Sequence, residues 1–223
     1  KICADEALSV SFKAAGTVYY VIRGEGCSTQ DNDVIEWRAG DLFCFPGAGK
    51  TVHQADGRDS LLFLATNEPL LSIDRLSPPP AAEAVVETVH WPADEITRQF
   101  EPVLRRPITE KTSGHAVLFS SSALGGSTNI LPTVNCALNT LESGKDQRPH
   151  RHNGVAVTLC IRGQGVYSQI DDQRVDWIDF GVQITPPAAL HSHHNRGPER
   201  MECLIFQDEA LHYHTRTPGF SWT

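Results

Sequence analysis

The chain has 223 residues, of which 40% are hydrophobic and 21% are charged, and its formal net charge is -8. These proportions are those of an ordinary soluble globular protein, with room for one large domain or for two of about 100 residues each. It contains no apolar run of the roughly 18 residues needed to cross a membrane, so a membrane protein is not expected. The negative charge and the lack of a long basic run argue against a nucleic-acid partner.

The cysteines are even in number but widely scattered through apolar, strand-like runs. They show no Cys-x-x-Cys spacing, and no secretory leader precedes them in the sequence. We therefore expect reduced thiols in a cytoplasmic protein. The six positions are Cys3, Cys27, Cys44, Cys136, Cys160 and Cys203.

An internal repeat divides the chain into two copies of one β module. Residues 17–26, TVYYVIRGEG, match residues 156–165, AVTLCIRGQG, including the closing Arg-Gly-x-Gly turn, and Trp37 matches Trp177. Short apolar or alternating runs, separated by Gly, Asn and Pro turns, predict the strands of a β-sandwich or barrel in each copy. The fold class expected is all-β.

The two copies are predicted to be separate modules joined by a linker. The first module is expected over residues 1–80, the linker over 81–110 and the second module over 111–223. Within the linker, apolar residues at helical spacing in the segment 90–106 predict a short helix, with Asp94 as its N-cap.

Three histidines of the second module have the spacing of a metal site. His150 and His152 lie one residue apart in a predicted strand, so both side chains project to the same face, about 6–7 Å apart along the chain. His191 follows the next hairpin and could join them across the sheet. The resulting three-nitrogen site would keep open positions for water, substrate or oxygen.

The second module resembles the cupin motifs in the order of six residues: Gly144, His150, His152, Pro186, His191 and Asn195. Together with the duplication, the pieces RPHRHN and HSHHN resemble bicupins of the gentisate 1,2-dioxygenase-like group, over nearly the whole chain. The resemblance implies two tandem double-stranded β-helix barrels and Fe(II) held by His150, His152 and His191. It also implies O₂-dependent cleavage of a hydroxylated aromatic acid and a homo-oligomer, either a dimer or a tetramer.

The same resemblance assigns His193 as the catalytic acid/base or substrate-binding histidine. Many cupins carry a Glu shortly after the H-x-H pair, where this chain has Ala156 and Val157. The gentisate-like group often has an inward Arg for the substrate carboxylate, and Thr158 stands at that position. The candidate substrate-binding residues are Arg148, Thr158, Gln183 and Gln207.

The first module is expected to bind no metal. The residues matched to the three ligands are Ser11, Lys13 and Thr51. Among the histidines of the site, only His193 has a histidine at the matching position of the first module, which is His53. Next to His193, the neighbouring His194 should point to the outer, exposed face. A second H-x-H pair, His212 and His214, lies beyond the last predicted strand and is not expected to bind the metal.

Three functions follow from these residues. The preferred one is a non-haem Fe(II) dioxygenase that uses O₂ to open the ring of a gentisate- or salicylate-like acid, an activity of aromatic compound degradation. Imidazole ligands also suit Mn(II), Ni(II) or Zn(II), so a metal-dependent isomerase or lyase of a small acid is an alternative. A non-enzymatic cupin that binds a small ligand is another, since fold and site do not guarantee turnover.

Overall fold

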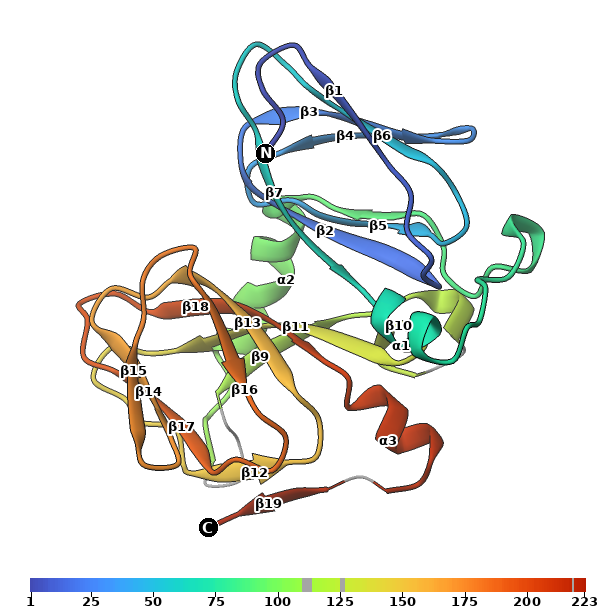
Figure 1. Ribbon diagram of the computed structural model, residues 1–223. Coiled ribbons are helices and arrows are strands. Elements are labelled where there is room, and N and C mark those ends of the chain that lie inside the picture. Colours follow the sequence, from blue (N-terminus) through green and yellow to red (C-terminus); the bar gives the residue numbers. More distant parts are fainter. Residues whose placement is uncertain (110–113, 125–126, 218) are drawn as a thin grey trace. The chain divides into compact units, whose positions relative to one another are not determined.

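The computed structural model describes residues 1–109, 114–124, 127–217 and 219–223 (Figure 1). It is an all-β fold, as predicted, and it divides into two compact units. The first unit comprises residues 1–98 and 121–132, and the second comprises residues 99–120 and 133–223. The predicted end of the linker, between residues 110 and 111, lies outside the described residues, so the proposed module boundaries remain a prediction.

The first unit contains two four-stranded antiparallel sheets, in the orders β1-β6-β3-β4 and β7-β2-β5-β8. Side chains from both sheets meet in one apolar core that includes Tyr19, Trp37 and Phe43. From Val34 to Arg38 in β4 the burial alternates, with Ile35 and Trp37 inward, as expected of a strand with one face on the core. The elements of this unit are β1 (Ala7–Val10), β2 (Gly16–Arg23), β3 (Glu25–Gln30), β4 (Asp33–Arg38), β5 (Leu42–Pro46), β6 (Thr51–Ala55), β7 (Leu61–Thr66), α1 (Glu68–Ile73), η1 (Ala81–Glu83), β8 (Val89–Trp91), η2 (Ser122–Leu124) and β10 (Asn129–Leu131).

The predicted linker helix is present as α2 (Ala93–Leu104), but the prediction of its N-cap was wrong. Asp94 lies inside the first helical turn, where a carboxylate favours the positive end of the helix dipole. The buried carboxylate of Asp41 performs the capping instead, because its Oδ1 accepts a hydrogen bond of 2.8 Å from the backbone N–H of Ala93. A distant residue thus satisfies a donor that the helix itself leaves open.

The second unit repeats the arrangement. One sheet has the order β11-β18-β13-β16, with β9 also paired to β11, and the other has the order β15-β14-β17-β12-β19. Its elements are β9 (His115–Phe119), β11 (Val134–Leu141), β12 (His150–His152), β13 (Ala156–Arg162), β14 (Val166–Ile170), β15 (Gln173–Asp176), β16 (Val182–Thr185), β17 (His191–Asn195), β18 (Met201–Gln207), α3 (Ala210–His214) and β19 (Phe220–Trp222).

The strand pairing confirms the duplication and corrects one detail of it. Thr51 pairs with Val10 in the first unit, as His191 pairs with His150 in the second, so Val10 rather than Ser11 occupies the place of His150. The module still lacks the ligands. Beyond β18, the predicted end of the β structure, the chain forms α3, which carries His212, and then one more strand, β19.

Two further findings concern the chain as a whole. No disulfide joins any of the cysteines in the described structure, in agreement with the expectation of reduced thiols. Within the described ranges, no helix combines the length and the apolar character that a membrane crossing would require.

Candidate metal centre

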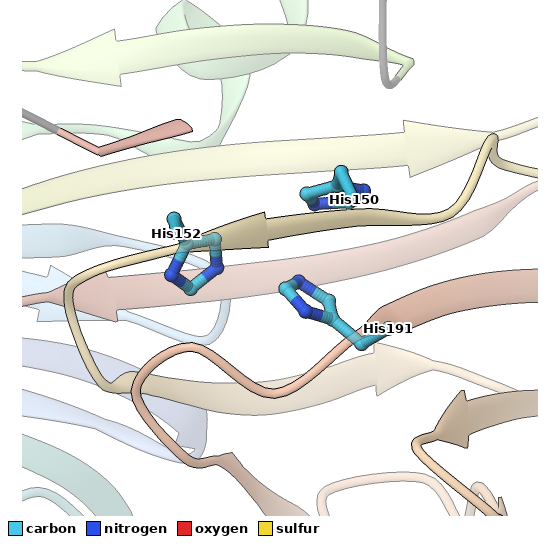
Figure 2. A group of neighbouring side chains, drawn as sticks. All are labelled: His150, His152 and His191. Atoms are coloured by element: carbon cyan, nitrogen blue, oxygen red, sulfur yellow. The ribbon is translucent and has the colours of Figure 1, made fainter. Parts of the chain in front are cut away.

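Two neighbouring strands bring the three predicted histidines together. His150 and His152 lie on β12, and His191, the first residue of β17, pairs directly with His150 (Figure 2). The alternation of the strand buries both histidines of β12 and leaves the intervening Arg151 exposed. Each of the three residues offers a ring nitrogen within 4.8 Å of the others, which is close enough to hold one metal ion.

Backbone carbonyls orient all three rings. A carbonyl oxygen can only accept, so the Nδ1 atom in each contact carries the hydrogen and donates it. The Nε2 atom of each ring therefore keeps its lone pair, which is the form that a metal binds, and the ring cannot rotate freely. The three hydrogen bonds run from His150 to Arg148 O at 3.0 Å, from His152 to Gly154 O at 2.8 Å and from His191 to Ala189 O at 3.0 Å.

Burial keeps two of these rings neutral. It lowers the pKa of His191 from 6.5 to about 4, and it also lowers the pKa of His150. A neutral ring can bind a metal at neutral pH without first losing a proton. Neutral imidazoles suit Fe, Cu, Ni and Zn, and three of them leave part of the coordination sphere open. The residues present thus fit a catalytic transition-metal ion.

The histidines lie on the wall of a cavity of about 120 Å³. Most of the other polar residues on this wall carry an amide or a hydroxyl, and its described residues include no lysine or arginine. The lining consists of Ala137, Asn139, Gln147, His150, His152, Ala156, Thr158, Thr185, His191, His193, Ile205, Gln207, Glu209 and Phe220. The cavity therefore combines three histidines with mostly neutral hydrogen-bonding groups and one carboxylate, that of Glu209.

The comparisons with known proteins agree with this geometry. Residues 137–206 match the cupin domain family. The salicylate 1,2-dioxygenase of Pseudaminobacter salicylatoxidans superposes with a TM-score of 0.83, covering 99% of this chain and 72% of that one at 13% identity. A structure of that enzyme described as its adducts with gentisate has a TM-score of 0.78, covering 97% and 70% of the two chains at 13% identity.

The chain has a bicupin fold. A cupin 2 conserved barrel domain protein from Leptotrichia buccalis also superposes, with a TM-score of 0.59 over 92% of this chain and 78% of that one at 12% identity. No curated protein matches the chain by sequence. At these identities the similar structures establish the fold of the bicupin and leave its activity to be argued from its own residues.

The bicupin places two of the four candidate substrate residues on the cavity wall. Thr158 is buried there, and the amide nitrogen of Gln207 lies 3.2 Å from Nε2 of His152. Gln183 is outside the cavity lining, although it pairs in register with Thr158 and its buried amide has no hydrogen-bond partner among the described residues.

Arg148, the remaining candidate, lies at the surface. Its Nε donates a hydrogen bond of 3.1 Å to the carbonyl of Thr223, and its guanidinium lies 5.6 Å from the centre of the Trp222 ring. Arg148 is therefore engaged with the C-terminal strand in this structure and is not among the residues that line the cavity.

Several residues of the cavity wall were missed by the sequence analysis, among them Asn139, Thr185, Glu209 and Phe220. Asn139 and Thr185 could have been predicted, because side chains two residues apart on a strand point to the same face. Each lies an even number of residues from another lining residue, or from a buried residue, on its own strand. Glu209 and Phe220 carried no such signal, because they follow the last motif and reach the cavity only through the path of the folded chain.

His193 is held by a hydrogen-bonded chain of buried side chains. Nε1 of Trp177 donates to Oγ of Ser168 at 2.7 Å, and this oxygen lies 2.8 Å from Nδ1 of His193. Burial, aided by the neighbouring histidines, lowers the pKa of His193 to about 3. His193 lines the cavity beside the three candidate ligands.

The first unit contains the same three-residue chain. Nε1 of Trp37 donates to Oγ of Ser28 at 2.7 Å, and this oxygen lies 2.6 Å from Nδ1 of His53. This unit lacks the three histidines that accompany the trio in the second unit. The trio can therefore stabilise a barrel without a metal ion beside it. In the first unit Nε2 of His53 is buried without a hydrogen-bond partner, whereas in the second unit His193 lines the cavity.

The two residues after His193 have structural roles. His194 faces away from the cavity, as predicted, but it is half-buried rather than exposed, stacked on Tyr167 and hydrogen-bonded to Asp146 at 2.6 Å. Asn195 is fully buried, and its side chain bonds the backbone of Leu141, Glu199 and Gly197. It thereby fixes the turn that follows β17.

Proposed function

We propose that this bicupin is a non-haem Fe(II) dioxygenase that cleaves the ring of a gentisate- or salicylate-like acid with O₂. The observation that carries the proposal is the arrangement of His150, His152 and His191, three rings with oriented Nε2 atoms on the wall of one cavity. The similarity to a salicylate 1,2-dioxygenase supports the class of substrate. Bound Fe(II) would supply the oxygen chemistry of the reaction, which no side chain can provide.

The triad has an electrostatic function in this proposal. Three neutral imidazoles add no negative charge to the site, unlike the cupin sites that include a Glu. Ala156, close after the H-x-H pair, is small and uncharged and itself lines the cavity. The three ligands therefore leave the positive charge of a bound divalent ion uncompensated, which favours an anionic substrate that offers two oxygen atoms, and Glu209 is the one carboxylate among the described residues of the cavity wall.

The cavity wall would recognise the rest of the substrate. Asn139, Thr158 and Thr185 offer amide and hydroxyl groups that can bond the hydroxyl and carboxyl oxygens of a substrate. Ala137 and Ile205 add apolar surface for the ring. This combination of apolar contact with a few polar groups is typical of small-molecule sites, and it excludes water from reactive intermediates.

His193 would serve as a hydrogen-bond donor in this reaction. The hydroxyl of Ser168 already accepts from Trp177, so its own hydrogen can be given to Nδ1 of His193. In that arrangement Nε2 carries the hydrogen of the neutral ring. Such a donor on the cavity wall can stabilise negative charge that develops on a substrate oxygen.

Oxygen uptake by iron-loaded protein tests the proposed activity. Protein reconstituted anaerobically with Fe(II) should consume O₂ with gentisate or salicylate and yield a ring-opened acid. H191A should lose both bound iron and oxygen uptake, whereas H194A, altered on the opposite face of the same strand, should keep both. Absence of uptake with every aromatic acid tried, by protein that holds iron, would contradict the proposal.

A further inference from the structure

An additional strand covers the metal-binding strand of the second unit. β19 (Phe220–Trp222) pairs antiparallel with β12, so that Trp222 lies opposite His150 and Phe220 lies opposite His152 (Figure 1). The match to the cupin domain family ends at residue 206, before this strand begins. Without β19, the short strand β12 would have an unpaired edge on this side.

The aromatic residues of β19 contact a candidate ligand directly. The ring of Phe220 lies 5.1 Å from the ring of His150 at an angle of 26°, and the ring of Trp222 lies 5.4 Å from it. The ring of Phe220 also lines the cavity, while 48% of the residue remains exposed. A side chain that borders both the cavity and solvent lies at the rim of the cavity.

Several hydrogen bonds fix this strand to the chain around the histidines. The backbone N–H of Asn153 donates to the carbonyl of Gly219 at 2.9 Å, and its side-chain amide donates to the carbonyl of Thr217 at 2.8 Å. At the other end, the N–H of Thr223 donates to the carbonyl of Pro149 at 3.2 Å. Hydrogen bonds before and after Phe220 therefore fix its backbone, and its ring can form part of the cavity wall.

The size of the cavity shows what such a wall would exclude. An engineered apolar cavity of about 150 Å³ holds one benzene molecule, and the cavity here measures about 120 Å³. A single aromatic ring is thus near the limit of the space. A fused second ring would have to displace a wall residue, and Phe220 is a large, half-exposed one at the rim.

We propose that Phe220 determines substrate size, restricting the metal cavity to acids with a single aromatic ring. The identity of these ligands as aromatic acids rests on the proposed function, whereas the steric limit is a property of the cavity alone. Forcing additional atoms into a packed space typically weakens binding about tenfold or more. The preference for one ring over two should therefore fall by about that factor when Phe220 is shortened.

Binding of neutral probes tests the steric limit without any catalysis. Imidazole and benzimidazole would be titrated into the cobalt-loaded full chain, with visible absorption as the readout. F220V, which puts a shorter residue of high strand propensity at this position, should raise the affinity for benzimidazole relative to imidazole about tenfold over the wild type. S221A, a change at the neighbouring exposed residue, should leave the ratio unaltered. An unchanged ratio in F220V would overturn the proposal.

A turnover measurement distinguishes failure of this proposal from failure of the proposed function. Iron-loaded wild type should consume oxygen with salicylate but not with 1-hydroxy-2-naphthoate, and F220V should accept both. Equal turnover of the two acids by the wild type would refute the size limit but not the dioxygenase. No turnover together with the expected probe ratios would refute the dioxygenase but not the size limit.

Metal content, measured by elemental analysis, provides the remaining check. F220L, which keeps more apolar bulk against His150, would be examined beside F220V. If both variants lost the metal while S221A kept it, Phe220 would act by holding His150 in place, and the assignment as a size determinant would be wrong.

Discussion

Replacing Ser168 by Ala should test whether the Trp-Ser-His chain supports catalysis or only folding. S168A would remove the acceptor of the Trp177 N–H and the partner of Nδ1 of His193. The molecule contains its own control, because S28A removes the corresponding oxygen between Trp37 and His53 in the first unit. Both serines are completely buried, so water cannot replace the lost hydroxyl without entering the barrel.

The expected loss of stability is the same for the two variants. Each leaves two buried polar groups without a partner, at about 1–3 kcal/mol for each group, so the free energy of unfolding should fall by about 2–6 kcal/mol. Domains are stable by about 5–15 kcal/mol, so both variants should remain folded at room temperature. Urea unfolding followed by circular dichroism measures the difference.

The expected loss of activity is different for the two variants. S168A should lower kcat/KM for oxygen uptake about 10- to 100-fold, the usual effect of removing a residue that orients a group at a metal site, while S28A should leave it unchanged. S168T, which retains a hydroxyl, should recover part of the loss. If S28A reduced turnover as much as S168A, or if S168A left turnover intact, the proposed role of His193 would be refuted.

Three further outcomes are expected. Burial lowers the pKa of His53 from 6.5 to about 4, so the unfolded chain takes up its proton first as the pH falls. The contribution of His53 to the free energy of unfolding is therefore fully present above pH 6.5, and it falls by about 2 kcal/mol between pH 7.5 and 5. Urea titrations of H53L should lack this part of the decline. N195A should lower the free energy of unfolding by about 2–4 kcal/mol, since it removes three buried hydrogen bonds; a loss below 1 kcal/mol would contradict this. Burial raises the pKa of Cys44 and Cys160 to about 12, so mass spectrometry should show iodoacetamide adducts on them only after unfolding.

The sequence by itself determined the strands, the duplication and the three candidate metal ligands. Alternation along a strand has a period of two, so the shared face of His150 and His152 followed from their spacing alone. The comparison of the two copies identified which module lacks ligands because equivalent residues could be aligned. These are properties of short segments, and local chemistry is sufficient to predict them.

The tertiary structure decided the features that depend on register and on distant contacts. The pairing of His191 with His150, the replacement of Ser11 by Val10 in the alignment of the copies and the capping of α2 by Asp41 all join segments that the sequence leaves far apart. A shift of one residue in register would turn His191 to the other face of its sheet. No local pattern determines such a choice, because it is set by the packing of the whole barrel.

The same limit applies to the environment of the histidines. The sequence contains Ser168, Trp177 and Phe220, but nothing in their spacing shows that two of them hold His193 and that the third covers His150. Hydrogen bonds to the Nδ1 atoms come from carbonyls, which every residue has, so they leave no mark in the sequence. The residue types establish which chemistry is possible, and the fold determines which atoms face the cavity to perform it.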